Sequence, residues 1–312
     1  MTTAWLFPGQ GTQQVGMGKE LHASSRAARE IWERADAALG FSLKELCFEG
    51  PEAELTRTMH AQPAIVTTSI AALAALREAV PTLALPACSA GHSLGEYSAL
   101  VAAGALGFED AVRLVHLRGR AMQEAVPEGL GGMAAIMGGD AAAIEALCRD
   151  AAEGEVVSPA NFNAPGQIVI SGHKTAVERA VTLAGERKLK AILLKVSAPF
   201  HCSLMATAAA RMKAALSEVV PSKLAFPVFA NVEAKPNTDA ARVAELLVRQ
   251  VDSPVQWEQT LLAMAEAGVT RALEIGPGKV LAGLARRIDK RVSVLSVGDP
   301  ESIAKAAEFL AG

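Results

Sequence analysis

The stretch CSAGHSLGEYSAL, Cys88 to Leu100, contains the pattern that decides the fold. It ends a short apolar run, turns at GHSLG (91–95) and continues as an apolar helical pattern. A serine between two glycines, after a strand and before a helix, is typical of a nucleophile elbow, which exposes the serine at the carboxyl edge of a sheet. The pattern therefore favours Ser93 as a nucleophile. The alternative is a tight turn in which Ser93 has no chemical role.

The composition favours a core of small aliphatic side chains. Of 312 residues, 51% are hydrophobic but only 4% are aromatic, which suits a parallel sheet covered by helices. The net charge of −3 and the lack of like-charge blocks argue against nucleic-acid binding. The first residues do not resemble a signal peptide, and apolar windows such as 61–76 are too short for a membrane span. We expect a cytoplasmic protein that binds no membrane.

The four cysteines lie far apart and form no C-x-x-C pair, so neither a zinc site nor a disulfide framework is predicted. Strands are expected at 3–7, 86–92, 226–230, 271–275 and 292–297. Helical patterns lie between them, and this alternation predicts βα units in a mostly parallel sheet.

The middle of the chain has a different order of elements. The expected series is a strand at 131–137, a helix at 140–152, strands at 155–159 and 167–171, a helix at 173–187 and a strand at 190–197, with NFNAPG (161–166) as a hairpin loop. This β-α-β-β-α-β order is ferredoxin-like. We expect a small ferredoxin-like domain, 127–197, inserted in a large α/β-hydrolase-like domain formed by 1–126 and 198–312. The crevice between two such domains favours a ligand site.

A serine nucleophile needs a base. His92 adjoins Ser93, but neighbouring side chains on a sharp turn point apart. A packing or orienting role therefore suits His92 better than the role of the base. His116 falls on a charged helix face, where we expect exposure to solvent. His201 follows a strand and the loop SAPF, where the chain returns to the large domain. His201 is therefore the candidate base, and a helix-capping role is its alternative.

Arg118 is the least expected residue in the helical pattern of 111–125. At 100° per residue, the apolar side chains, Met122 among them, gather on one face, and Arg118 falls at the centre of that face. A buried guanidinium needs a carboxylate, because an unpaired buried charge costs several kcal/mol. That carboxylate is either an internal Asp or Glu, or it belongs to a substrate, which a planar guanidinium can bind through two hydrogen bonds.

Seven motifs in the same order resemble the malonyl-CoA:acyl carrier protein transacylases and the related acyltransferase domains of polyketide synthases. They are FPGQGTQ (7–13), GHSLGEYSAL (91–100), RG (118–119), NFNAPGQIVISG (161–172), PFHCSLM (199–205), LVRQ (247–250) and EIGPGKVL (274–281). The resemblance covers about residues 4–290 with its spacing intact, so it is far more specific than the elbow alone.

The resemblance implies a role for each matching residue. Ser93 would carry the acyl group, His201 would be its base, and Arg118 would bind the free carboxylate of malonyl. The main-chain N–H groups of Gln10 and Leu94 would hold the oxyanion. The main-chain carbonyl of Gln250 would orient His201, so that no acidic third member of a triad is expected.

The implied reaction is a ping-pong transfer of malonyl from malonyl-CoA to the phosphopantetheine thiol of acyl carrier protein, without a metal or redox cofactor. Phe200 and Met122 are expected in the substrate pocket; Phe200 would favour malonyl over methylmalonyl, or would only fill the domain interface. We expect a monomer. Basic residues that could meet an acidic carrier protein are Lys188, Lys190, Arg286, Arg287 and Lys290. The competing functions are a serine hydrolase and a non-enzymatic scaffold that binds carrier protein.

Overall fold

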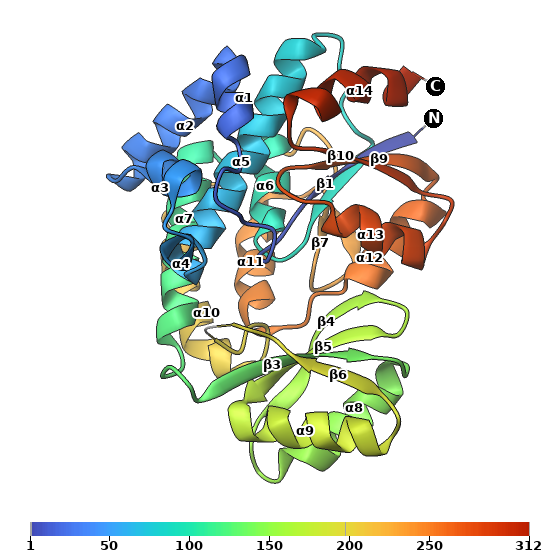
Figure 1. Ribbon diagram of the computed structural model, residues 1–312. Helices are drawn as coiled ribbons and strands as arrows, with labels where there is room; N and C mark the ends of the chain where they lie inside the picture. Colours follow the sequence, from blue (N-terminus) through green and yellow to red (C-terminus); the bar gives the residue numbers. More distant parts are fainter. Residues whose placement is uncertain (1, 197, 312) are drawn as a thin grey trace.

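The protein, seen in a computed structural model that describes residues 2–196 and 198–311, contains two separate β-sheets (Figure 1). The larger sheet has the strand order β10-β9-β1-β2-β7-β8, and every neighbouring pair is parallel except β7 and β8. Its strands are β1 (Thr2–Phe7), β2 (Cys88–Gly91), β7 (Val228–Ala230), β8 (Lys235–Asn237), β9 (Val269–Ile275) and β10 (Ser293–Val297). The prediction of a mixed α/β fold with a mostly parallel sheet is confirmed.

Helices cover both faces of this sheet, because successive side chains of a strand point to opposite faces. In β1, Trp5 and Phe7 belong to the core beneath α5 (Thr58–Ala79) and α14 (Pro300–Ala311), whereas Ala4 and Leu6 pack in a second core with α12 (Trp257–Glu266) and α13 (Val280–Ile288). The other helices of this part are α1 (Lys19–Ser24), α2 (Arg26–Leu39), α3 (Leu43–Glu49), α4 (Glu52–Leu55), α6 (Gly95–Ala102), α7 (Phe108–Glu124), α10 (Ala206–Leu216) and α11 (Val243–Asp252), with 3₁₀ turns at Ser203–Met205 and Ala240–Arg242.

Helix α5 is the central helix of the larger part. By length and composition it could cross a membrane, but 83% of its most apolar window is buried inside the fold. It packs closely against α7, since a Cβ atom at Gly119 would lie 2.4 Å from the carbonyl oxygen of Thr58. Only glycine permits this approach of the two backbones. The contact places Arg118, the preceding residue, beside α5.

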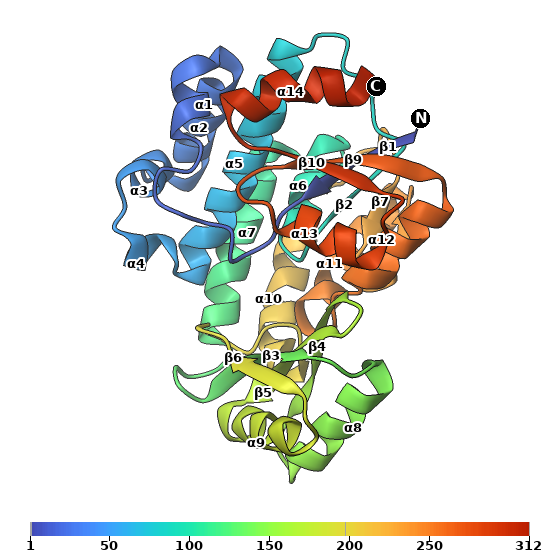
Figure 2. The same ribbon diagram turned by 45° about the vertical axis from the view of Figure 1, so that its right-hand side comes forward.

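The second sheet is antiparallel, with the strand order β4-β5-β3-β6. Its elements are β3 (Gly131–Met137), α8 (Ala141–Ala152), β4 (Val157–Ala164), β5 (Gln167–His173), α9 (Lys174–Glu186) and β6 (Lys190–Leu193). Helices α8 and α9 cover the face of this sheet that points away from the larger sheet (Figures 1 and 2). They enclose a core of their own.

Two boundaries in this segment differ from the sequence prediction. The NFNAPG stretch is not a loop: its first four residues belong to β4, and the hairpin turn is only Pro165–Gly166. Two irregularities in the β4–β5 register accommodate the polar strand, and Asn161 also forms a parallel bridge with Val255. Strand β6 ends at Leu193, and Ser197, the predicted end of the strand, lies outside the described residues.

Candidate active site

The elbow around Ser93 requires both of its glycines. A Cβ atom at Gly91 would lie 1.9 Å from the main-chain carbon of Gly95, and one at Gly95 would lie 2.3 Å from the carbonyl oxygen of Phe7. The chain therefore turns from β2 into α6 in close contact with the end of β1. Ser93 itself has φ 51°, a strained left-handed conformation for a residue with a side chain. This conformation places Ser93 between the end of β2 and the start of α6.

Ser93 and His201 form a hydrogen-bonded pair, although 108 residues separate them. Ser93 Oγ lies 2.8 Å from His201 Nε2, and His201 Nδ1 lies 2.9 Å from the main-chain carbonyl oxygen of Gln250. Because a carbonyl can only accept a hydrogen bond, Nδ1 carries the proton and Nε2 is left to accept one from the serine. Burial, reinforced by the nearby positive charge of Arg118, lowers the pKa of His201 to about 3. His201 is therefore a neutral base near pH 7.

Arg118 lies in the same site, with only 1% of its surface exposed. Its Nη1 donates to Gln62 Oε1 at 2.8 Å, and its Nη2 donates to Gln250 Oε1 at 2.8 Å and to Ser93 Oγ at 3.1 Å. Within the part of the chain that the structure describes, Arg118 forms no salt bridge, and its Nε–H has no hydrogen-bond partner. Burial lowers the pKa of Arg118. Among the residues that the structure describes, the hydrogen-bond partners of Arg118 are thus neutral oxygens, and none is a carboxylate.

Ser93 and His201 lie at the wall of a cavity of about 700 Å³. Gln10, Met122 and Phe200 line it, together with Ser93, His201 and Arg118. Gln10 is held beside the elbow by the turn after β1, where a Cβ atom at Gly9 would lie 2.5 Å from the carbonyl oxygen of His92. The cavity therefore gathers residues predicted from four separate motifs.

Leu94 follows Ser93 and caps the N-terminus of α6, where main-chain N–H groups have no partner within the helix. That position suits an oxyanion. His92 does not contact Ser93 Oγ; its Nε2 lies 2.8 Å from Asn163 Oδ1, which ties the elbow to β4. His116 is not solvated as predicted: it is half-buried, with Nδ1 2.8 Å from the carbonyl oxygen of Met59, because α7 packs against α5.

Sequence reasoning missed three polar residues around the pair. Gln62 is buried on α5 and binds Arg118, Asn231 follows β7 and binds the main chain of Ser93, and Glu96 is buried in the first turn of α6. Asn231 directly follows β7, and β7 pairs in parallel with β2, which ends at the elbow. Because the two strands end at the same edge of the sheet, the position of Asn231 after a strand was a usable signal. Gln62 gave only the weak signal of an amide within an apolar run.

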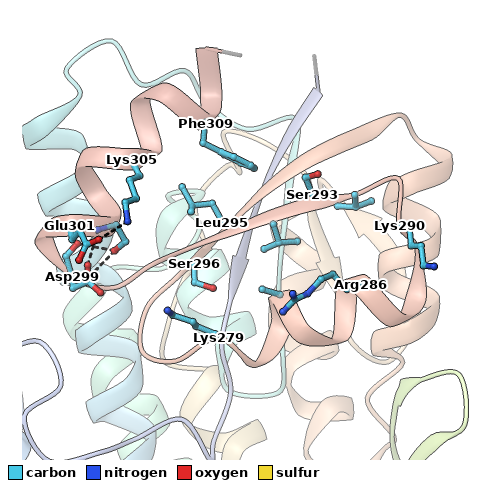
Figure 3. Close-up of a pocket in the computed structure, with 14 residues that line it drawn as sticks. Lys279, Arg286, Lys290, Ser293, Leu295, Ser296, Asp299, Glu301, Lys305 and Phe309 are labelled. Carbon is cyan, nitrogen blue, oxygen red and sulfur yellow. Dashed lines mark hydrogen bonds and ion pairs between the residues drawn. The ribbon is translucent and has the colours of Figure 1, made fainter.

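A second cavity of about 720 Å³ shares no residue with the first. It lies along the edge strand β10, between α13 and α14, and Figure 3 shows Lys279, Arg286 and Lys290 on one side and Lys305 and Phe309 on the other. The predicted basic residues are therefore divided. Arg286 and Lys290 line this cavity, whereas Arg287 bonds to the hairpin after β4 through Gln167 and Pro165.

Among residues 2–196 and 198–311, no group of three or more His, Cys, Asp and Glu side chains is placed to hold a metal ion.

Comparisons with known proteins agree on one family. The acyl transferase domain family matches residues 4–298. The malonyl CoA-acyl carrier protein transacylase of Salmonella typhimurium is 47% identical over 306 residues, which are 97% of this chain and 98% of that protein.

Among solved structures, the malonyl CoA-acyl carrier protein transacylase of Coxiella burnetii has a TM-score of 0.97 at 40% identity and covers 100% of this chain and 98% of its own. A malonyl-transacylase solved in complex with its type II polyketide synthase acyl-carrier protein has a TM-score of 0.96 at 43% identity, covering 99% of this chain and 100% of that one.

Proposed function

The chain belongs to the acyl transferase domain family, which confirms the resemblance seen in its motifs, and we propose that this acyltransferase moves malonyl from malonyl-CoA to the phosphopantetheine thiol of an acyl carrier protein. The relatives' names supply the donor and the acceptor. The observation in this chain that carries the proposal is the placement of Arg118 Nη2 3.1 Å from Ser93 Oγ. The carboxylate of malonyl is one CH₂ group away from its thioester carbon, so a cation adjacent to the nucleophile matches that substrate.

In the first half of the reaction, Ser93 Oγ attacks the thioester carbon and passes its proton to His201 Nε2. The negative charge that develops on the carbonyl oxygen is held by the N–H groups of Leu94 and Gln10. When the tetrahedral intermediate collapses, the C–S bond breaks and CoA leaves as a thiol with the proton from His201. The product is a malonyl ester on Ser93.

In the second half, the carrier-protein thiol gives its proton to the same nitrogen of His201 and attacks the ester carbon. The C–O bond to Ser93 breaks, and the Oγ atom regains its proton from His201. The carbonyl of Gln250 keeps His201 in one tautomer through both halves. In this scheme the residues of the chain and the two thiols supply every proton, so we propose that the reaction uses no metal or redox cofactor.

We also propose that 127–197 is a ferredoxin-like domain inserted between the two parts of the large domain. The element order β3-α8-β4-β5-α9-β6, the antiparallel sheet and its own core support this division. The insertion would form one wall of the substrate crevice, since Met133 and Asn161 line the cavity around Ser93.

The proposal is tested by incubating the protein with malonyl-CoA and recording its intact mass. We expect a malonyl adduct that Ser93→Ala abolishes and that a holo-carrier protein discharges much faster than water does. Discharge by water at the same rate would instead support a serine hydrolase. A protein that forms no adduct and turns over no malonyl-CoA would support the scaffold.

A further inference from the structure

One buried carboxylate at the elbow has no part in the reaction described above. Glu96 lies in the first turn of α6, three residues after Ser93, and only 3% of its surface is exposed. Its Oε2 accepts hydrogen bonds from Gln250 Nε2 at 2.7 Å and from the N–H of Asn231 at 3.0 Å. A buried carboxylate is costly, and a stable fold requires such contacts. The two donors, Gln250 and Asn231, also form hydrogen bonds with Arg118 and with Ser93.

The first contact determines the orientation of the Gln250 amide. Gln250 Nε2 donates to Glu96 and also to the carbonyl oxygen of Ser93 at 2.9 Å. These two acceptors use both N–H bonds of the amide. Its Oε1 is therefore turned toward Arg118, from which it accepts a hydrogen bond at 2.8 Å. A flipped amide would place its NH₂ group against the guanidinium. Both groups are donors, so no hydrogen bond could form between Gln250 and Arg118.

The second contact supports the main chain of the elbow. Asn231 Oδ1 accepts from the N–H of Ser93 at 2.7 Å, and its Nδ2 donates to the carbonyl oxygen of Gly91 at 2.7 Å. Asn231 and Gln250 thus hold the N–H and the C=O of Ser93, whose φ of 51° is strained. Within the part of the chain that the structure describes, Glu96 is the one side chain that forms hydrogen bonds with both of them.

We propose that Glu96 is a positioning residue for malonyl transfer: it fixes the amide of Gln250, which in turn holds the Arg118 guanidinium where the substrate carboxylate must bind. This inference rests on the proposed function. Among the described residues, Glu96 has no hydrogen bond to Ser93 Oγ or to His201, so it acts through Asn231 and Gln250, and only the route through Gln250 reaches Arg118. Burial raises the pKa of Glu96 to about 7, so its ionised and protonated forms are both present near neutral pH, and Oε2 can accept the hydrogen bond from Gln250 Nε2 in either form.

The inference predicts that replacing Glu96 changes the selectivity for malonyl-CoA over acetyl-CoA. Acetyl-CoA has no carboxylate for Arg118, so the position of the guanidinium matters less for acetyl transfer than for malonyl transfer. Glu96→Met removes the acceptor while nearly keeping the volume. The substitution removes both hydrogen bonds that Oε2 accepts, and we expect the malonyl kcat/KM to fall about 10- to 100-fold, the combined effect of losing two buried hydrogen bonds. We expect the ratio of malonyl to acetyl kcat/KM to fall about tenfold.

Glu96→Gln keeps an oxygen that can accept both hydrogen bonds, so it should retain most of the wild-type ratio. If Glu96 had only a structural role, Glu96→Met would lower kcat/KM equally for malonyl-CoA and acetyl-CoA. Glu96→Gln would then not restore the ratio selectively. The matched control is Glu266→Met, at an exposed glutamate that ends α12 and has no hydrogen bond or ion pair within the described residues. It should leave the ratio unchanged.

The assay is steady-state transfer from malonyl-CoA and acetyl-CoA to holo-carrier protein, with thermal unfolding to confirm that each variant is folded. If Glu96→Met does not fold, Glu96→Asp replaces it, because a carboxylate withdrawn by one CH₂ should also lower the ratio. An unchanged ratio in the folded variant, with active wild type, overturns the inference alone. A wild type that forms no malonyl ester on Ser93 overturns the proposed function and the inference with it.

Discussion

Arg118→Ala is the most discriminating perturbation of this site. Arg118 is almost fully buried, its partners are the neutral oxygens of Gln62, Gln250 and Ser93, and it forms no salt bridge within the described residues. A substrate carboxylate would therefore be its first partner of opposite charge in direct contact. Removing one member of a buried ion pair costs about 3–5 kcal/mol. We expect the malonyl kcat/KM to fall roughly 150- to 5,000-fold, at about 1.36 kcal/mol per factor of ten.

Acetyl transfer should respond differently. Alanine at position 118 removes a positive charge that depresses the pKa of His201, which strengthens His201 as a base, and it leaves room for the methyl group of acetyl. We expect acetyl kcat/KM to be retained or to rise. The measurement is transfer of each acyl group to holo-carrier protein, with thermal unfolding as the control for folding.

Arg118→Lys is the matched variant. Lysine keeps the charge but lacks the planar guanidinium that donates to Gln62 and Gln250 together. Its malonyl kcat/KM should therefore lie between those of the wild type and Arg118→Ala. Equal losses for malonyl and acetyl in Arg118→Ala would refute the reasoning, because Arg118 would then be structural.

Two further predictions concern the elbow and the base. Gly95→Ala should destabilise the fold severely, since its Cβ would lie 2.3 Å from the carbonyl oxygen of Phe7. Gly283→Ala on α13 is the control, because its Cβ meets nothing within 4 Å, and it should stabilise the fold by about 0.5–1 kcal/mol. Similar unfolding temperatures for the two variants would contradict this account. Because the pKa of His201 is lowered to about 3, its imidazole should remain neutral, with the proton on Nδ1, from pH 8 to pH 5. Nitrogen chemical shifts of His201 measure this directly, and titration near pH 6.5 would show that the ring is not buried as described.

Local patterns were sufficient wherever a residue's role depends on its own segment. The glycines of GHSLG predicted the elbow because a turn that tight excludes Cβ atoms, and the structure places main-chain atoms within 2.4 Å of both positions. The helical projection predicted that Arg118 faces inward, because an apolar stripe on a helix faces the core. The same reasoning failed for NFNAPG, since its asparagines resemble a loop, but Asn161 pairs with Val169 of β5 and with Val255.

The sequence by itself indicated the family, most of the order of elements, the candidate nucleophile and the inward-facing cation. Only the tertiary structure decided which distant groups meet: His201 with Ser93 across 108 residues, Gln250 with Arg118 across 132, and Glu96 with Gln250 across 154. The physical reason is that periodicity and turn chemistry report on contacts within one helix or strand. A hydrogen bond between a strand end, a helix terminus and a returning loop depends instead on how the parallel sheet orders its strands, and no local pattern contains that order.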